Sequence, residues 1–261
     1  MDAEELLDIG LTYQLRGKLE KAEEYFKKAL LRNPRLMRAY VGLGDIYLKT
    51  NRFDMAEQMY KKGVEIHPEY EKACLNLARL YILKGEEDKA FSSYERALSL
   101  GPNDWRASKG IGYLYLTKDE LDKAIGWLKM ALEGNEEDLA IHFWLVLAYH
   151  QKELKDEMDE EIEKVRGICN NIKKFLPRPA PILSYILGKV SALEGKYKEA
   201  IEHLEEVRKK VKVKNRRKLE LGVFYNEIDI LKTLAEVYEK NEQRALSHLI
   251  QKEIAAALAG S

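Results

Sequence analysis

Hydrophobic and aromatic positions recur along the first half of the chain with a period of 34 residues. A column of tyrosines keeps this spacing at Tyr13, Tyr47, Tyr81, Tyr115 and Tyr149. Four further columns share it: Ala22, Ala56, Ala90 and Ala124; Phe26, Tyr60, Tyr94 and Leu128; Gly10, Gly44, Ala78 and Gly112; and Pro34, Pro68 and Pro102. Several columns in one register are typical of a tandem repeat.

The spacing inside each repeat predicts two helices. Gly or Ala stands three residues before the tyrosine, so both lie on one helical face, where the small residue lets a neighbouring helix approach closely. The alanine and the aromatic residue four positions later form the facing stripe of a second helix, which the proline ends. Gly17, Gly85 and Gly195 are predicted to lie in the turns between paired helices. Such a hairpin buries its apolar face only by stacking on its neighbours.

These columns resemble the tetratricopeptide repeat pattern W-x2-L-G-x2-Y…A-x3-F…A…P. The first unit matches it at Leu6, Ile9, Gly10, Tyr13, Ala22, Phe26, Ala29 and Pro34. Three units follow in the same register, so the clear units span 3–36, 37–70, 71–104 and 105–138. The resemblance implies an all-α fold, a right-handed α-solenoid of about seven helix hairpins, the last three of them degenerate.

The second half of the chain keeps the pattern less well. A degenerate unit at 139–172 is followed by a Pro-rich break at 173–181, which we interpret as a hinge or a spacer. The segment 181–261 is predicted to contain degenerate units, an insertion at 215–227 and a final capping helix. The predicted domains are therefore an N-terminal array at 3–172 and a C-terminal array beyond the break.

Charge and composition narrow the possible functions. The chain carries 44 Lys and Arg residues and 44 Asp and Glu residues, so its formal net charge is zero. This balance argues against a general nucleic-acid coat or a strongly basic membrane protein. Charged residues make up 34% of the chain, an excess that fits long solvated helices with paired charges.

The cysteines, the N-terminus and the apolar stretches of the sequence indicate in which cellular compartment the protein is expected. Cys74 and Cys169 are far apart in sequence, so we expect free, mostly buried thiols in a reducing compartment. The N-terminus is acidic and lacks a signal-peptide pattern, and the most apolar stretch is too short to cross a bilayer. We therefore predict a cytoplasmic protein without a transmembrane segment.

Sequence motifs of catalysis are absent. There is no phosphate-binding loop, no nucleophile elbow and no H-E-x-x-H motif. His142 takes a packing position in its unit and has no second ligand three or four residues away, so we expect it to be buried or half-buried rather than a metal ligand. The sequence therefore predicts no enzyme, with no catalytic residue, no metal and no cofactor.

In tetratricopeptide repeats the first helices of the units line a concave groove, and the resemblance implies which side chains face it. The predicted partner-binding residues are Arg38, Asp45, Lys72, Leu75, Arg79, Arg106, Lys109, Tyr113, Phe143, Leu147 and Tyr185. Arg38, Lys72 and Arg106 stand 34 residues apart, as a ladder of cations beside apolar side chains. We predict a non-catalytic protein–protein interaction scaffold that binds an acidic and apolar peptide or partner domain. The alternative is that these cations pair with acids of neighbouring helices.

A basic segment at 208–218 is the sharpest charge asymmetry in the chain. Its cations are Arg208, Lys209, Lys210, Lys212, Lys214, Arg216, Arg217 and Lys218. RNA or an anionic surface is therefore an alternative partner, although no aromatic residue in the segment stacks on bases, which makes nucleic acid unlikely as a partner. Self-assembly into a homo-oligomer is another alternative, because the ends of solenoids stack when a cap is imperfect.

Overall fold

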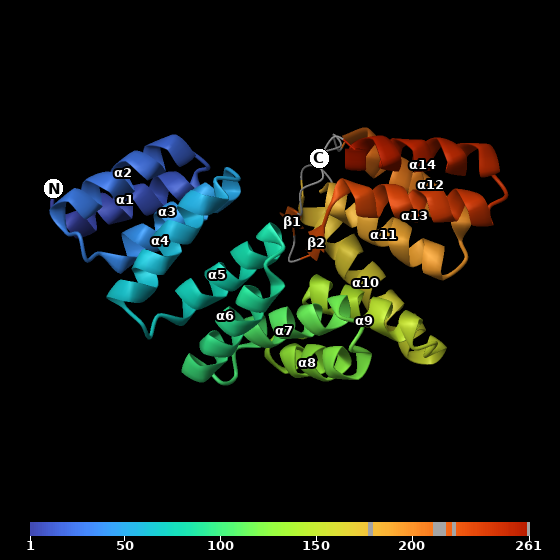
Figure 1. Ribbon diagram of the computed structural model, residues 1–261, viewed down its shortest axis with the longest axis horizontal. Helices are drawn as coiled ribbons and strands as arrows, with labels where there is room; N and C mark the ends of the chain where they lie inside the picture. Colours follow the sequence, from blue (N-terminus) through green and yellow to red (C-terminus); the bar gives the residue numbers. More distant parts are fainter. Residues whose placement is uncertain (177–179, 211–217, 221–222, 260–261) are drawn as a thin grey trace. The chain divides into compact units, whose positions relative to one another are not determined.

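The computed structural model describes residues 1–176, 180–210, 218–220 and 223–259. These residues form fourteen helices and two short strands (Figure 1). In chain order the helices are α1 (Ala3–Leu15), α2 (Leu19–Arg32), α3 (Met37–Lys49), α4 (Phe53–Ile66), α5 (Glu71–Lys84), α6 (Glu87–Leu100), α7 (Trp105–Thr117), α8 (Leu121–Gly134), α9 (Leu139–Gln151), α10 (Lys155–Phe175), α11 (Pro181–Leu193), α12 (Tyr197–Lys210), α13 (Glu227–Lys240) and α14 (Arg244–Ala259). The predicted α-solenoid of seven helix hairpins is confirmed.

The chain divides into two compact units, Met1–Leu114 and Tyr115–Ser261. The division falls inside α7, and the Pro-rich break at 173–181 lies within the second unit.

Arg166 of α10 shows how residues before and after the break are joined. Its guanidinium lies 2.5 Å from a Glu194 carboxylate oxygen, 2.9 Å from Glu199 and 3.1 Å from the Ser191 hydroxyl. These charge-assisted hydrogen bonds connect α10 to α11 and α12.

The aromatic column fills space that glycines leave open. The ring of Phe26 is fully buried, and a Cβ atom at either Gly10 or Gly42 would come within 2.6 Å of it. A Cβ atom at Gly44 would likewise come within 2.4 Å of the Tyr60 ring. The close approach expected at the glycine column is confirmed at Gly10 and Gly44, and Gly42 is a second contact that the column did not include.

The turns inside the hairpins recur with the same period. The left-handed turn residue has φ between 58° and 78° in five successive hairpins, at Gly17, Asn51, Gly85, Asp119 and Glu153. The following residue donates its N–H to the carbonyl of the column tyrosine, as Lys18 does to Tyr13 at 2.9 Å. The glycines predicted to lie in the turns are confirmed there, and non-glycine residues adopt the same conformation in the other units.

Acids on second helices bind the hairpin that follows. Glu23 of α2 accepts hydrogen bonds from the Tyr47 hydroxyl at 3.1 Å and from Arg52 at 2.7 Å. Glu57 of α4 accepts one from Lys84 at 2.6 Å. Burial opposes ionisation of both carboxyls, but the hydrogen bonds from nearby cations lower the pKa of each to about 2. These ion pairs therefore tie successive hairpins together.

A buried pair joins α9 to α10. Nδ1 of His142 lies 2.5 Å from Oε2 of Glu161, and Nε2 lies 2.7 Å from the backbone oxygen of Glu136. Both partners are acceptors, so the ring satisfies them together only as the doubly protonated imidazolium. Burial lowers the pKa of His142, but these two hydrogen bonds outweigh it and raise that pKa above its ordinary value. The buried position expected for His142 is confirmed.

The insertion in the C-terminal array contains the two strands. β1 (Lys218–Glu220) pairs with β2 (Val223–Tyr225) in antiparallel register, with Leu219 opposite Phe224. The all-α expectation did not include this pair, because runs of three residues are too short to show a period of two.

Two further expectations concern the thiols and the membrane. Cys74 and Cys169 are free and buried, as predicted. Across the described residues, no helix combines the length and apolar character needed to cross a bilayer. The cytoplasmic location stays a prediction.

A methyl group added at Gly42 is expected to destabilise the protein. Gly42→Ala places Cβ 2.6 Å from the buried Phe26 ring, so the ring or the backbone has to shift. Overpacking of this kind costs about 1–3 kcal/mol, measured as a lower denaturant midpoint. The matched control is Gly126→Ala in α8, where no atom lies within 4 Å of the new Cβ and alanine adds about 0.5–1 kcal/mol of stability. Equal shifts in the two variants would contradict the packing argument.

The contribution of His142 to stability is expected to depend on pH. Its folded-state pKa lies above 6.5, so the stabilisation is fully present below that pH and is lost as the pH rises through the folded pKa. The His142→Gln variant should therefore lose most stability in mild acid and approach the wild type as the pH rises. Denaturant midpoints across this range measure the effect, and His67→Gln, at an exposed histidine, is the control. A constant gap between wild type and His142→Gln would contradict it.

Candidate binding groove

The cations predicted to face the first part of the groove differ in their surroundings. Arg38 on α3 and both Lys72 and Arg79 on α5 are exposed. The guanidinium of Arg38 lies 3.9 Å from the exposed carboxylate of Glu4. Among the described residues, Lys72 and Arg79 form no ion pair. These two side chains are therefore available to a partner.

Asp45 lies beside these two cations and is held by two polar side chains. Its Oδ1 accepts hydrogen bonds from the Tyr60 hydroxyl at 2.7 Å and from the Asn76 amide at 3.0 Å. Burial raises the pKa of Asp45, against the hydrogen bond from Tyr60 and the positive charges of Lys72 and Arg79. Asp45 therefore serves the packing of α3 on α4 and α5.

Arg106 is engaged by two acids of the preceding repeat. Its guanidinium forms an ion pair with Asp104 and lies 3.4 Å from Glu71. A hydrogen bond shared with Asp104, together with burial and its negative charge, raises the pKa of Glu71 to about 7. The charge of the third cation in the predicted ladder is thus partly neutralised within the protein. Arg106 therefore matches the alternative interpretation of the sequence, in which the cations of the ladder pair with acids of neighbouring helices.

Several predicted apolar contacts are less accessible than the sequence suggested. Leu75 is 4% exposed and Phe143 is 2% exposed, so neither offers a surface to a partner. The ring of Phe143 instead packs edge-on against that of Tyr185, at 6.2 Å between centroids. Tyr113 is half-buried, and Lys109, also half-buried, lies 4.7 Å above the Trp105 ring.

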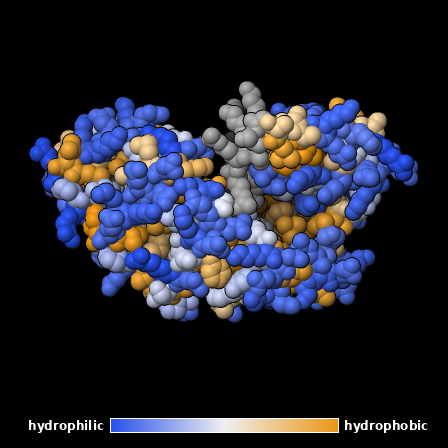
Figure 2. All heavy atoms as spheres, in the orientation of Figure 1, coloured by the Kyte–Doolittle hydropathy of each residue, from blue (hydrophilic) through white to orange (hydrophobic). Residues whose placement is uncertain are grey.

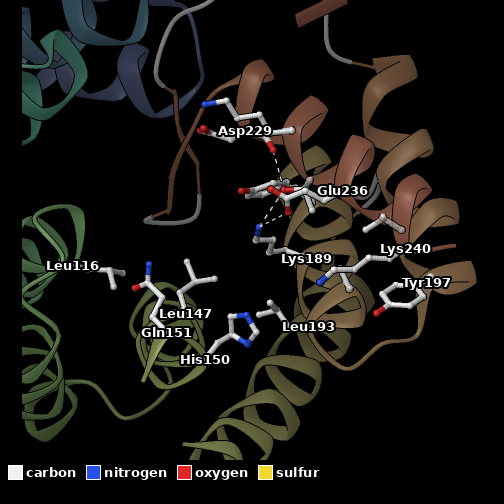
Figure 3. A pocket seen from close by; sticks show the side chains of 15 residues that line it. Leu116, Leu147, His150, Gln151, Lys189, Leu193, Tyr197, Asp229, Glu236 and Lys240 are labelled. Atoms are coloured by element: carbon white, nitrogen blue, oxygen red, sulfur yellow. Dashed lines mark hydrogen bonds and ion pairs between the residues drawn. The ribbon is translucent and has the colours of Figure 1, made fainter. Parts of the chain in front are cut away.

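A groove of about 390 Å³ opens in the unit Tyr115–Ser261 (Figure 3). Its walls are α9, α11 and α13, with contributions from the end of α7 and the start of α12. The lining residues are Leu116, Leu147, His150, Gln151, Tyr185, Lys189, Ala192, Leu193, Tyr197, Asp229, Lys232, Thr233, Glu236, Val237 and Lys240. Two of the predicted residues, Leu147 and Tyr185, are thereby brought together in one groove.

The groove places leucines beside basic side chains. In Figure 3, His150 from α9 faces the space into which Lys189 of α11 and Lys240 of α13 extend. Nζ of Lys189 donates to the Thr233 hydroxyl at 3.3 Å and lies 4.0 Å from Glu236. Partial burial and the charges of the two lysines lower the pKa of His150 below its ordinary value. The field in this part of the groove is therefore positive.

Sequence reasoning did not single out these three basic residues. Lys189 and His150 occupy repeat positions that face the groove in units 181–214 and 139–172, so the family pattern carried a signal for both. Lys240 follows the insertion at 215–227, where the 34-residue period no longer fixes the register.

Half of the predicted basic segment is outside the described residues, namely Lys212, Lys214, Arg216 and Arg217. Of the rest, Arg208 pairs with Glu205 at 2.9 Å and with Glu253, whereas Lys209 is exposed. Lys210 is the last residue of α12, and Lys218 is the first residue of β1. In the part of the chain that the structure describes, no group of three acidic, histidine or cysteine side chains is placed to hold a metal ion.

Comparison with solved structures finds the same fold in several proteins. A tetratricopeptide repeat protein from Parabacteroides merdae has a TM-score of 0.62 at 20% identity, covering 98% of this chain and 93% of the other. PilF of Pseudomonas aeruginosa has a TM-score of 0.64 at 13% identity, covering 79% and 90%. YrrB, described as a TPR protein with an unusual peptide-binding site, has a TM-score of 0.51 at 23% identity, covering 64% and 86%. These identities show a shared fold alone.

Sequence comparison supplies the family. No curated protein matches the chain significantly. Two family descriptions of the tetratricopeptide repeat match residues 2–69 and 75–138, which together make up half of the chain. The chain therefore belongs to the tetratricopeptide repeat family, whose repeats generally mediate protein–protein interaction and are generally not enzymes.

Proposed function

We propose that this protein is a non-catalytic binding module that holds a peptide segment of a partner in the groove between α9, α11 and α13. The observation that carries the proposal is an open groove of about 390 Å³ in which Leu116, Leu147 and Leu193 lie beside lysines. A segment with both apolar and acidic side chains matches this lining.

The interaction free energies indicate how much the ion pairs and the apolar contacts each contribute to binding. An exposed ion pair contributes about 0–1 kcal/mol, so lysines alone do not hold a partner firmly. Burying a leucine side chain contributes about 1.5–3 kcal/mol. The half-buried Leu147 and Leu193 are therefore the proposed anchors, and the cations select acidic partners.

The unit Met1–Leu114 offers a second acidic-partner contact. Lys72 and Arg79 are exposed on α5, and the half-buried Asp45 beside them is already bound by Tyr60. An acidic segment of the partner relieves the repulsion between these cations. We propose these two residues, with Arg38, as a separate partner-binding surface of this unit.

Disrupting the apolar anchor is expected to release the partner. Leu147→Asp places a charge where an apolar side chain of the partner is buried, so binding should weaken by about tenfold or more. Proteins captured from the source lysate by the wild type are identified and then titrated as purified proteins against the wild type and the variant. Leu15→Asp, at a leucine that is 90% exposed, is the matched control and should leave affinity unchanged. Equal affinity of all three proteins for the same partner would refute the groove.

The contribution of the cations to binding is tested with a second pair of variants. Both variants must first be shown to have an unchanged helical spectrum. Lys72→Glu combined with Arg79→Glu should weaken binding at low salt more than at high salt, because salt screens exposed charges. Lys62→Glu, at an exposed lysine on α4, is the control. If neither the substitutions nor the salt concentration changed the affinity, Lys72 and Arg79 would not contact the partner.

Self-association is a second candidate function, favoured by the last helix. Leu246, Leu249 and Leu258 of α14 are between 41% and 52% exposed. Figure 2 shows hydrophobic residues gathered over the C-terminal end of α14. A second copy that packs on this face would bury the apolar surface at the end of the array.

Light scattering distinguishes this second candidate. Self-association predicts a mass above the 30.2 kDa of one chain that rises with concentration and falls to one chain in Leu249→Glu. A wild-type mass of one chain at every concentration would exclude it.

A further inference from the structure

Three basic side chains, each from a different helix, line the groove. His150 lies in the last turn of α9, Lys189 is near the middle of α11, and Lys240 ends α13. In Figure 3 the imidazole of His150 and the ammonium group of Lys240 border the same space, and the ammonium group of Lys189 turns toward Glu236. We call His150, Lys189 and Lys240 the basic corner.

The acids of the groove do not neutralise the basic corner. Asp229 accepts the backbone N–H of Asn226 at 2.9 Å in the capping box of α13, so its carboxylate is engaged at the start of that helix. Glu236 lies 4.0 Å from Lys189. Among the described residues, no ion pair reaches Lys240 or its neighbour in the groove, Lys232. Positive charge is therefore in excess.

Burial and this excess of positive charge act on the pKa of His150 in the same direction. Partial burial, then the positive charges of Lys189 and Lys240, hold the pKa of His150 below its ordinary value of 6.5. The imidazole is thus neutral at neutral pH. Burial of the ring would remain, but an anion placed among the three groups would offset the positive charges of Lys189 and Lys240 and favour the protonated ring.

We propose that the basic corner binds the carboxylate of an Asp or Glu side chain of the bound peptide, and that this binding transfers a proton from the solvent to His150. The inference rests on the proposed function and specifies one subsite within the groove. The ammonium groups of Lys189 and Lys240 attract the carboxylate, and the newly formed imidazolium donates a hydrogen bond to it. Leu147 and Leu193 then contact the residues on either side of the acid.

The sign of the pH dependence follows from the proton count. In this proposal His150 has a lower pKa in the free protein than in the complex. At a pH between these two values the complex carries up to one proton more than the free protein, so affinity falls as the pH rises through that interval. The other titratable groups that line the groove are Asp229, Lys232 and Glu236 of α13, Tyr185 of α11 and Tyr197 of α12. His150→Gln removes this pH dependence and leaves those groups in place.

The first experiment needs no ligand. The ring protons of His150 are followed by NMR against pH in the full chain and are assigned by their loss in His150→Gln. Lys189→Gln and Lys240→Gln should each raise the pKa of His150 toward its ordinary value, and Lys252→Gln on α14 should leave it unchanged. A His150 pKa that neither lysine variant moves would overturn the basic corner.

The second experiment uses two short peptides as probes, acetyl-Leu-Glu-Leu-amide and acetyl-Leu-Gln-Leu-amide at millimolar concentration. The glutamate peptide should bind about threefold to tenfold more tightly and raise the pKa of His150, whereas the glutamine peptide should not. Lys240→Gln should abolish this preference, and Lys252→Gln should keep it.

The outcomes separate the two proposals. Equal binding of both peptides, seen as shifts of the Leu147 and Leu193 methyl signals, would overturn the carboxylate subsite and leave the peptide groove standing. Binding of neither peptide would overturn both proposals. Preference for the glutamate peptide without a change in the His150 pKa would overturn the proton uptake.

Discussion

The contact on which the rest of the structure depends is a large side chain seated on glycine backbones. The ring of Phe26 meets Gly10 of its own hairpin and Gly42 of the next, so one side chain fixes the distance between neighbouring hairpins. Leu204 takes the corresponding place against Gly188 in the C-terminal unit. Because each hairpin positions the next, α9, α11 and α13 lie in a row and present their side chains to one groove.

Charge has two separate uses in this neutral chain. Glu23 and Glu57 form ion pairs with cations of the following hairpin, and Arg106 forms ion pairs with Asp104 and Glu71. Those pairs hold the array together. In the groove, by contrast, Lys232 and Lys240 form no ion pair among the described residues, so their charge is available to the proposed partner. A balanced composition therefore does not exclude local fields strong enough to select a partner.

The period of 34 residues was enough to predict the hairpins, the turn at Gly17 and the packing of the glycine column, because these features depend on contacts between residues close in sequence or one repeat apart. Burial of Leu75 and Phe143 was not predictable, since it depends on how neighbouring helices cover those positions. The two short strands, 218–220 and 223–225, and the position of Lys240 in the groove were also missed, because the insertion interrupts the period, which then no longer fixes the register.

The buried His142 also constrains how the sequence can change over time. Its ring is held between two acceptors, and Glu161 is almost as deeply buried. Replacing either side chain alone strands a polar or charged partner away from water. An apolar pair would fit the same space without that penalty, but every single-step route to it passes through a less stable protein. A substitution at one of the two positions is therefore expected to lower stability unless the other position changes with it.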